Sequence, residues 1–323
     1  MSYVSEREVK GKKYYYLEES LRHGGKLIKE SIYLGSMSPS NEVLLNAFEK
    51  LKQECAKKNH QIMVPPLTEF ISSRTAGILE EAKKKSTRLL HSFTVKQKQE
   101  FLQRQRVTFI TESNAIEGSS LGYEETKSIL DKKKRIEELQ KKNAIVTGLQ
   151  REEQEAMNLE NCMKLYDKML AKNEKISHEM ILRLHYALLR DISGYEKYQG
   201  IYRPVQVYIS GSTHEFPIPQ EVNGLMSLLI NWHHEKENLI HPVELAAKFH
   251  TKFTSIHPFA DGNGRMARLL MNYILQQQKF PFTNIPLKRR SVYMKTQAAG
   301  NKEDFKLFTR FLIEEVVKQN LKK

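Results

Sequence analysis

The stretch from 257 to 268 gathers polar side chains and glycines between two otherwise apolar segments. The residues able to do chemistry are a histidine, an aspartate, a Gly-Asn-Gly run and two arginines: His257, Asp261, Gly262, Asn263, Gly264, Arg265 and Arg268. The Gly-Asn-Gly run can adopt backbone conformations closed to most residues, so successive N–H groups can converge on one anion. A helix that follows the run would add the positive end of its dipole. The spacing therefore predicts a phosphate-binding loop.

The charged residues of this loop suggest what would happen to a bound phosphate. Arg265 and Arg268 place two permanent cations near the start of the following helix, and each guanidinium can fork onto a phosphate group. Asp261 offers a carboxylate to a divalent cation such as Mg²⁺. His257 titrates near neutral pH and can take a proton from a hydroxyl that attacks phosphorus. A histidine at a helix end is by itself more often a cap or a core residue, so the prediction depends on the complete set.

Two amphipathic helices are expected to position the loop. Apolar residues at three- and four-residue spacing start at Pro242 and stop at Pro258, and the same period resumes at Arg265. Long segments with this spacing also fill most of the chain from about 40 to 197. The fold is therefore expected to be mainly helical.

The loop resembles the signature of the Fic family, H-x-F-x-[DE]-G-N-G-R-x-x-R, at all eight specified positions. The resemblance implies a helical bundle that transfers AMP from ATP to a Ser, Thr or Tyr hydroxyl of a target protein. It makes His257 the base and Asp261 the Mg²⁺ ligand. The run 262–264, with Arg265 and Arg268, would bind the triphosphate, and Phe259 would point into the core.

A second segment, 113–118, reads SNAIEG and resembles the family's inhibitory motif, [ST]-x-x-x-E-[GN]. Ser113 is expected to cap the start of a helical turn, and Glu117 to lie near a helix end that Gly118 closes. The resemblance implies that Glu117 pairs with Arg268 and prevents ATP from binding in a productive pose. An ordinary capped turn with a surface glutamate is the alternative interpretation.

Residues 201–219 differ from their surroundings, because β-branched residues alternate before a glycine-containing turn and two prolines. The pattern predicts a short hairpin at 205–216, which resembles the flap that pairs with the target segment in the family. Its expected contact edge is Val207, Tyr208 and Ile209. A hairpin without any binding role is the alternative.

The pocket for adenosine is less clearly marked in the sequence. Asn272, which follows Arg268 on the same predicted helix, could contact the adenosine. Tyr273 and Tyr293 could do likewise, but core packing is the preferred interpretation for both tyrosines.

The chain is expected to have three parts: a small β-hairpin appendage at 1–40, a helical region at 41–104 and the Fic region at 105–323. The appendage is predicted from aromatic and β-branched runs at 12–17 and 27–35, separated by a glycine turn. The resemblance covers roughly 105–315, so the role of residues 1–104 is not assigned by it.

Composition narrows the remaining function classes. The 323 residues carry a formal net charge of +14, but the lysines are spread over helix-like segments, so nucleic acid is not the expected partner. No apolar run is long enough for a membrane span or an export signal, so a cytoplasmic protein without a membrane partner is expected. Two cysteines, Cys55 and Cys162, are expected to be inert thiols.

Three alternatives to adenylyl transfer stay open from the sequence. The chain could chiefly remove AMP from a target, or use another nucleotide as donor, or be a nucleic-acid-binding regulator whose loop senses nucleotide. ATP as substrate and Mg²⁺ as cofactor are the expected small-molecule partners. The resemblance is also compatible with a homodimer.

Overall fold

The computed structural model describes residues 2–23, 26–40, 43, 44, 46, 47, 50, 51, 68–140, 151–208 and 214–321. These residues form two compact units, one containing Met1–Glu69 with Asn238–His241, the other Phe70–Glu237 with Pro242–Lys323. The boundary predicted between 104 and 105 falls inside the helix Val95–Ile116. None of the described helices has the length and apolar character needed to cross a bilayer.

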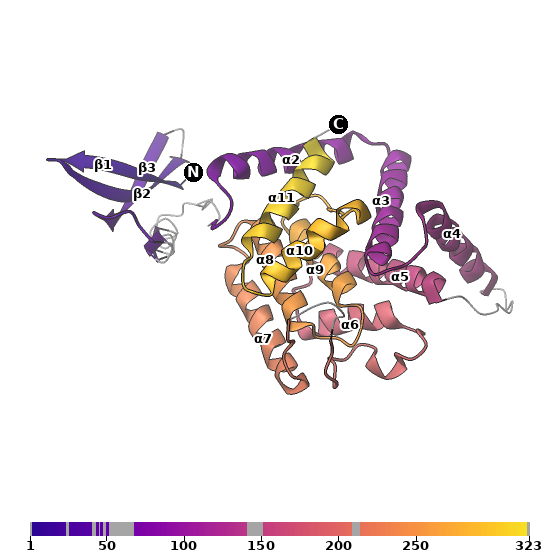
Figure 1. Ribbon diagram of the computed structural model, residues 1–323. Helices are drawn as coiled ribbons and strands as arrows, with labels where there is room; N and C mark the ends of the chain where they lie inside the picture. Colours follow the sequence, from indigo (N-terminus) through magenta and orange to yellow (C-terminus); the bar gives the residue numbers. More distant parts are fainter. Residues whose placement is uncertain are drawn as a thin grey trace. The chain divides into compact units, whose positions relative to one another are not determined.

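The first unit contains a three-stranded antiparallel sheet of order β1-β2-β3, formed by Ser2–Val9, Lys12–His23 and Lys26–Gly35 (Figure 1). β1 and β2 are joined at Lys10 and Gly11, both with positive φ, as in the tight turns whose twist matches paired strands. One face of the sheet packs on a small core of Leu17, Ala47 and Leu51.

The sequence prediction of a two-stranded appendage was incomplete. Both predicted strands are present, but β1 adds a third, paired with β2 from Ser2↔Glu19 to Val9↔Lys12. β1 was missed because three consecutive charged residues, 6–8, interrupt it and both Val4 and Val9 are exposed, so no apolar face marks the strand. The predicted Gly24-Gly25 turn lies outside the described residues.

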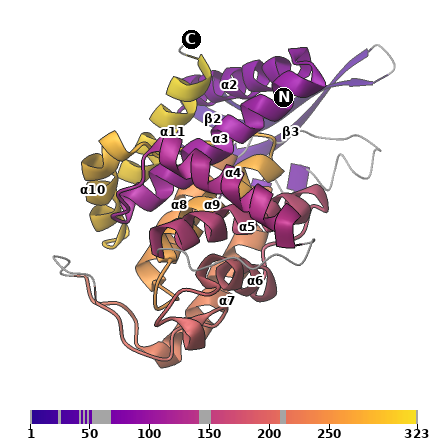
Figure 2. The same cartoon turned by 90° about the vertical axis from the view of Figure 1, so that its right-hand side faces the viewer.

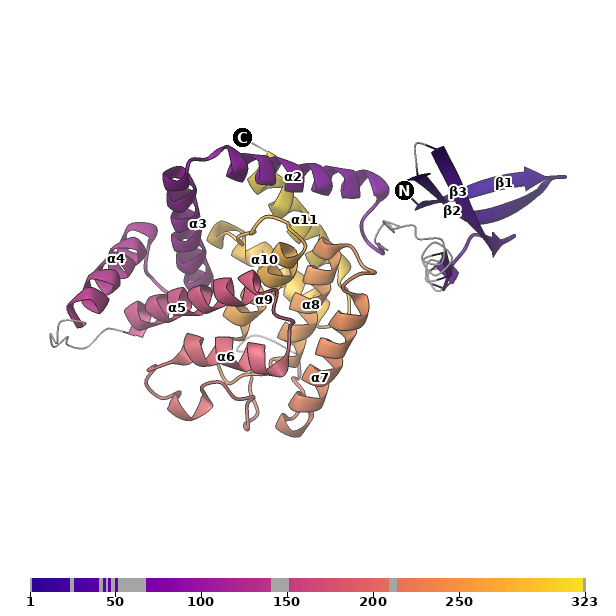
Figure 3. The same cartoon turned by 180° about the vertical axis from the view of Figure 1, so that it is seen from behind.

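The second unit is helical, as predicted. Its elements, in chain order, are α2 (Ser73–Ser92), α3 (Val95–Ile116), α4 (Tyr123–Gln140), α5 (Arg151–Ala171), α6 (His178–Leu189), η1 (Glu196–Tyr198), α7 (Pro219–Lys236), α8 (Pro242–Ile256), α9 (Asn263–Gln277), η2 (Leu287–Arg289), α10 (Arg290–Gly300) and α11 (Lys306–Leu321). α9 packs against α8, α5 and α3, and is buried along nearly its whole length (Figures 1 and 3).

The helices α3 and α5 bring distant parts of the sequence to the start of α9. α3 begins at a capping box in which Thr94 and Gln97 exchange side-chain and backbone hydrogen bonds, and it ends beside α9. α4 lies outside α3 and α5, and contacts both (Figure 2). Cys162, in α5, is buried, and burial raises the pKa of its thiol, as expected for an inert cysteine; Cys55 lies outside the described residues.

Candidate active site

The loop between α8 and α9 has a fixed backbone. His257 (φ 52°) and Gly262 (φ 80°) both adopt the left-handed conformation that reverses the chain at each end of the loop. Asn263 spans the loop: its Nδ2 donates to the Phe259 carbonyl at 2.8 Å, and its Oδ1 accepts from the Phe259 N–H at 2.9 Å. The Asn263 side chain therefore shapes the loop through both its amide nitrogen and its amide oxygen.

A buried histidine from α6 supports the loop from inside. His185 stacks on Phe259, with ring centroids 3.6 Å apart and planes 7° apart. Its Nε2 donates to the Asp261 carbonyl and its Nδ1 accepts from the Gly200 N–H, each at 3.1 Å. Burial lowers the pKa of His185 to about 3, so the ring stays neutral and keeps both bonds. The sequence offered only one signal for this role, a histidine at an apolar position of a predicted helix.

His257, at the end of α8, is half-buried and neutral. Its Nδ1 donates to the Thr254 carbonyl at 3.3 Å, which leaves the lone pair on Nε2. Phe216 lies against the ring at a centroid distance of 4.4 Å. Burial lowers the pKa of His257 to about 4. The imidazole can therefore accept a proton at neutral pH.

Arg203 connects this loop to the segment around the predicted flap. Its Nε donates to the His257 carbonyl at 2.8 Å, and its Nη2 donates to the Pro217 carbonyl at 2.6 Å. Its Nη1 donates to the Val205 carbonyl at 3.0 Å. The same Nη1 also donates to Gln206 Oε1. Together these hydrogen bonds hold the two ends of the segment beside His257.

The N-terminus of α9 faces the end of α3. No side chain of the described residues caps α9, whose first turn begins after Gly262. A Cβ added to Gly264 would lie 2.2 Å from Glu117 Oε1 and 3.1 Å from Arg268 Nη1. Only glycine at 264 allows the Glu117 carboxylate to lie this close to the helix start.

Arg268, on the second turn of α9, is 1% exposed and holds the end of α3. Its Nε donates to Ser113 Oγ at 2.9 Å, and its Nη2 donates to the Ser113 carbonyl and to Glu117 Oε1, both at 2.8 Å. Its Nη1 has no hydrogen-bond partner among the described residues. The guanidinium also lies 6.0 Å from the centroid of the Tyr293 ring.

The predicted cap at Ser113 was wrong, although the predicted helix end was right. Ser113 lies in the last turn of α3, where it is buried against Arg268 and starts no helix. α3 ends at Ile116, and Gly118 follows with φ 110° and donates its N–H to the Ala115 carbonyl. Arg290 Nε donates to the last helical carbonyl, that of Ile116, at 2.7 Å.

The Glu117 side chain is 41% exposed, so its carboxylate lies between the protein and solvent. Its burial favours the neutral form, but the charge and hydrogen bond of Arg268 outweigh that effect and hold the pKa of Glu117 below its ordinary value. Glu117 is therefore ionised near neutral pH and pairs with Arg268.

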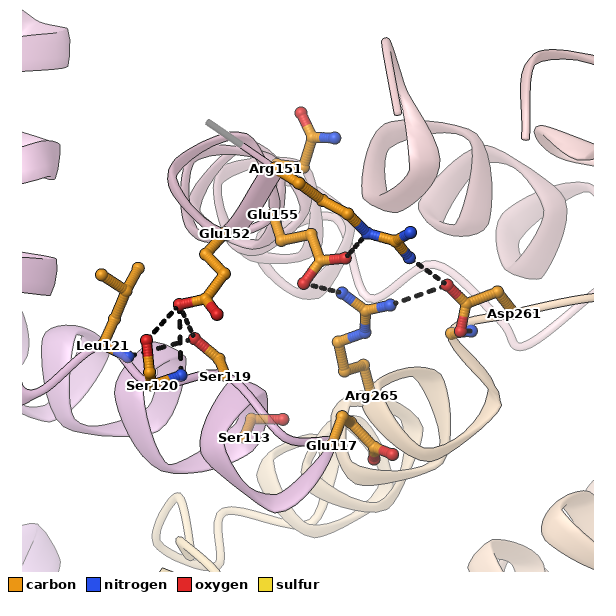
Figure 4. A network of polar contacts seen from close by, with 12 residues as sticks. Ser113, Glu117, Ser119, Ser120, Leu121, Arg151, Glu152, Glu155, Asp261 and Arg265 are labelled. Carbon is orange, nitrogen blue, oxygen red and sulfur yellow. Dashed lines mark hydrogen bonds and ion pairs between the residues drawn. The ribbon is translucent and has the colours of Figure 1, made fainter. Parts of the chain in front are cut away.

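Arg265 belongs to a separate cluster of charges at the first turn of α5 (Figure 4). Its Nη2 lies 3.4 Å from Asp261 Oδ2, and its Nη1 lies 3.6 Å from Glu155 Oε2. Arg151 closes the cluster, since its Nε donates to Glu155 at 3.0 Å and its Nη2 lies 3.7 Å from Asp261 Oδ2. No motif or spacing pointed to Glu155 or Arg151, which are more than a hundred residues from the loop in the chain.

The same turn of α5 also holds the segment that follows α3. Glu152 accepts hydrogen bonds from Ser119 Oγ at 3.1 Å and from Ser120 Oγ at 2.9 Å (Figure 4). The hydrogen bonds from Ser120 hold the pKa of Glu152 below its ordinary value. α5 therefore contacts both the α8–α9 loop and the residues after Glu117.

Comparisons with known proteins bear on this site. The Fic/DOC family profile matches residues 175–275, a range that includes His185, Arg203 and the whole loop. The protein adenylyltransferase Fic of Nematostella vectensis is 28% identical, over 91% of this chain and 71% of the relative. That of Drosophila grimshawi is 33% identical, over 64% of this chain and 40% of the relative. Residues 175–275 therefore match the Fic/DOC family, and the chain as a whole is similar to proteins named protein adenylyltransferase Fic.

Solved Fic structures share the fold. Fic-1 of C. elegans (residues 134–508) aligns with a TM-score of 0.63 and 22% identity, over 87% of this chain and 76% of that one. A Fic domain containing signaling protein of Bacteroides thetaiotaomicron aligns with a TM-score of 0.62 and 21% identity, over 75% of this chain and 93% of that one. The chain spans about two fifths of the length of its insect relatives.

Asn272, which was predicted for the adenosine pocket, makes its hydrogen bonds inside the fold. Asn272 is fully buried, and its Nδ2 donates to the carbonyls of Arg268 and Thr283, both at 3.0 Å. Its Oδ1 accepts from the Thr283 N–H at 2.7 Å. Both N–H donors of the amide are used inside the protein, and the adenosine contact stays a prediction. Tyr273 and Tyr293 are buried, as the preferred interpretation required.

The predicted flap is described only at its two ends. Residues 205–208 and 214–218 have no strand, although Gln206 Nε2 donates to the Phe216 carbonyl at 3.0 Å and so brings the ends together. Val207 is half-buried, and Tyr208 is 85% exposed. Ile209 lies outside the described residues, so the predicted hairpin is tested only at its base.

Proposed function

We propose that this chain is a protein adenylyltransferase that transfers AMP from ATP to a Ser, Thr or Tyr hydroxyl of a target protein, and that Glu117 restrains it. The observation that carries the proposal is the state of Arg268. Its buried guanidinium is bound by Glu117 on one side, while its Nη1 has no partner among the described residues. A buried cation with an unused donor beside a glycine loop favours an anionic ligand.

The triphosphate would bind where the Glu117 carboxylate now lies. The N-terminus of α9 is uncapped, so its first N–H groups are available to phosphate oxygens. Gly264 allows an anion to approach the helix backbone, as the position of Glu117 Oε1 illustrates. The terminal phosphate and Glu117 would compete for Arg268, and this competition is the proposed restraint.

His257 would act as the base. The target oxygen attacks the α-phosphorus of ATP, its proton passes to Nε2 of His257, and the bond to the bridging oxygen breaks so that pyrophosphate leaves. The Nδ1 bond to Thr254 orients the ring with Nε2 available. Arg203 binds both the His257 carbonyl and the Pro217 carbonyl at the end of the flap. It would therefore hold the target segment near the imidazole of His257.

Asp261 has a donor set that fits Mg²⁺. Its carboxylate is partly exposed at the edge of the loop, and Mg²⁺ is usually held by one or two carboxylates together with phosphates and water. The ion would neutralise charge on the phosphate oxygens. Arg265 and Arg151 now lie near the same oxygen, so they would share Asp261 with the ion.

The flap would bind the target through its main chain. Val207 and Tyr208 follow Arg203 by four and five residues in the chain, and Arg203 Nε donates to the His257 carbonyl. Pairing of main chains requires little of the target sequence. Val207, Tyr208 and Ile209 are therefore proposed as the target-binding edge.

Labelled ATP and Mg²⁺ test the proposal with three variants. Glu117→Gly is expected to raise label transfer to lysate proteins or to the chain itself, because Arg268 becomes available to the triphosphate. His257→Ala in the Glu117→Gly background should abolish transfer. Glu81→Gly, on the exposed face of α2, removes the same charge far from the loop and should leave transfer at the wild-type rate.

Two further experiments distinguish adenylyl transfer from the use of another nucleotide and from the removal of AMP. Labelled GTP, CTP and UTP offered beside ATP identify the donor, and a purified AMP-modified product returned to the wild-type chain tests removal of AMP. Unchanged transfer by Glu117→Gly would remove the restraint from the proposal, and transfer by the His257→Ala double variant would remove the base.

A further inference from the structure

Three potential metal ligands converge at the last turn of α7. His233 and His234 lie in that turn and Glu237 follows it as the C-cap. One ligand atom from each lies within 4.8 Å of the other two. Nδ1 of His233 and Nδ1 of His234 lie 4.0 Å and 3.9 Å from Glu237 Oε2. This cluster is formed on α7 and shares no residue with the α8–α9 loop.

The two imidazole nitrogens that face Glu237 have no hydrogen-bond partner in the part of the chain that the structure describes. His233 is 2% exposed, and its ring packs edge-on against Phe249 at 5.5 Å. A polar atom this deeply buried is costly without a partner. The distances to Glu237 are too long for hydrogen bonds, so the carboxylate alone does not satisfy these nitrogens.

The tautomer of His234 also favours metal binding. Its Nε2 lies 2.8 Å from the Ile176 carbonyl, which can only accept, so Nε2 carries the proton. Nδ1 therefore carries a lone pair directed at the cluster. A ligating histidine whose other nitrogen donates to a carbonyl is the usual arrangement at metal sites, because that bond fixes the ring.

We infer that His233, His234 and Glu237 form a site for a divalent transition metal of the zinc type, with the fourth position open to water. Two imidazoles and one carboxylate match the nitrogen and oxygen ligands of Zn²⁺, whereas Mg²⁺ prefers oxygen alone. Zn²⁺ bonds of about 2.0–2.2 Å place neighbouring tetrahedral ligands roughly 3.4 Å apart. Glu237, at the helix end and 26% exposed in its side chain, can rotate to bring its carboxylate closer to the two nitrogens.

The ion would bind the last turn of α7 without linking distant segments, since all three ligands come from that turn. It would balance the Glu237 charge and give the buried His233 Nδ1 a partner. The site shares no residue with the proposed transferase site. Metal binding can therefore be measured whether or not the chain transfers AMP.

Metal binding is tested on the full chain, freed of metal with a chelator and dialysed. Calorimetric titration with ZnCl₂ should show one ion per chain at this site, and Co²⁺ should give the visible absorption of a tetrahedral complex. Zn²⁺ should also raise Tm. His234→Gln and Glu237→Gln should each weaken binding at least tenfold, and the double variant should lose the Co²⁺ band.

Glu235→Gln is the matched control, because Glu235 lies in the same turn but outside the cluster and carries the same charge as Glu237. It should bind the metal as the wild type does. The inference is overturned if the wild type gives neither heat nor a Co²⁺ band, or if the double variant retains wild-type affinity. Should the double variant fold poorly, Glu237→Gln alone decides, since it alters a partly exposed side chain.

Discussion

Glu117 Oε1 accepts a hydrogen bond from Arg268 Nη2 at 2.8 Å, although the two residues are 151 positions apart in the chain. Arg268 is the fixed member of the pair, because Ser113 takes two of its donors in a buried environment. Glu117 is the movable member, because it lies at the end of α3 with its side chain partly in solvent. The proposed release of the enzyme therefore requires movement of one exposed carboxylate and leaves the cation in place.

Ser113→Ala is expected to loosen this pair. The substitution removes the oxygen that accepts from Arg268 Nε and leaves a buried charged donor unsatisfied, at a cost of about 1–3 kcal/mol in the free energy of unfolding. Urea denaturation measures that loss, and labelled ATP measures the accompanying rise in basal transfer. A variant as stable as the wild type would show that Ser113 does not hold Arg268.

Gly264→Ala should conflict with Glu117. The added Cβ would lie 2.2 Å from Glu117 Oε1, so the unfolding free energy should fall by about 1–3 kcal/mol. In a Glu117→Gly background the same change should cost less, because only Arg268 Nη1 remains near the new atom. Gly224→Ala serves as the control: a Cβ there meets nothing within 4 Å on the exposed side of α7, and the change should stabilise the helix by about 0.5–1 kcal/mol. Equal costs in the two backgrounds would contradict the packing described here.

Asn272→Ala separates a structural residue from an adenosine contact. Loss of the amide removes the acceptor of the buried Thr283 N–H and one donor to the Thr283 carbonyl, which should lower the unfolding free energy by about 1–3 kcal/mol. If the residue acts only inside the fold, the folded variant in the Glu117→Gly background should keep the parent KM for ATP at a temperature well below Tm. A raised KM without loss of stability would support the adenosine contact.

The sequence was sufficient to predict the loop because its chemistry is contiguous. His257, Asp261 and the Gly-Asn-Gly run lie within a few residues of one another, and the helical period on both sides indicates their setting. The side-chain role of Asn263 was not visible, since an asparagine between glycines suits a phosphate loop as well as a bond across the loop.

Supporting residues from other helices could not be predicted by the same reasoning. Glu155 and Arg151 read as part of an ordinary charged helix, and His185 as one position of an apolar face. Their positions next to Arg265 and Asp261 depend on how α5 and α6 pack around α9, which local spacing does not determine. Ser113 was misassigned for a related reason: a serine before a glutamate suggests a cap unless the partner, here Arg268, is known.

The pH profile of transfer tests whether His257 is a neutral base in the folded protein. An imidazole with the ordinary pKa of about 6.5 would be only about one tenth neutral at pH 5.5, whereas burial lowers the pKa of His257 to about 4 and keeps it unprotonated there. The kcat of Glu117→Gly at saturating ATP should therefore change little between pH 7.5 and 5.5, with loss only as pH falls toward 4.

The stability of the folded chain sets the lowest pH at which kcat can be measured. Unfolded histidines take up protons below about pH 6.5. The folded protein lowers the pKa of His185 to about 3 and that of His257 to about 4, so the folded state is progressively destabilised as pH falls through this window. Kinetics should thus be recorded from pH 5.5 to 8, with Tm followed in parallel to confirm that the chain stays folded. A fall in kcat centred near pH 6.5 while Tm is still well above the assay temperature would mean that the base titrates as an exposed imidazole, and the burial of His257 described here would not govern its chemistry.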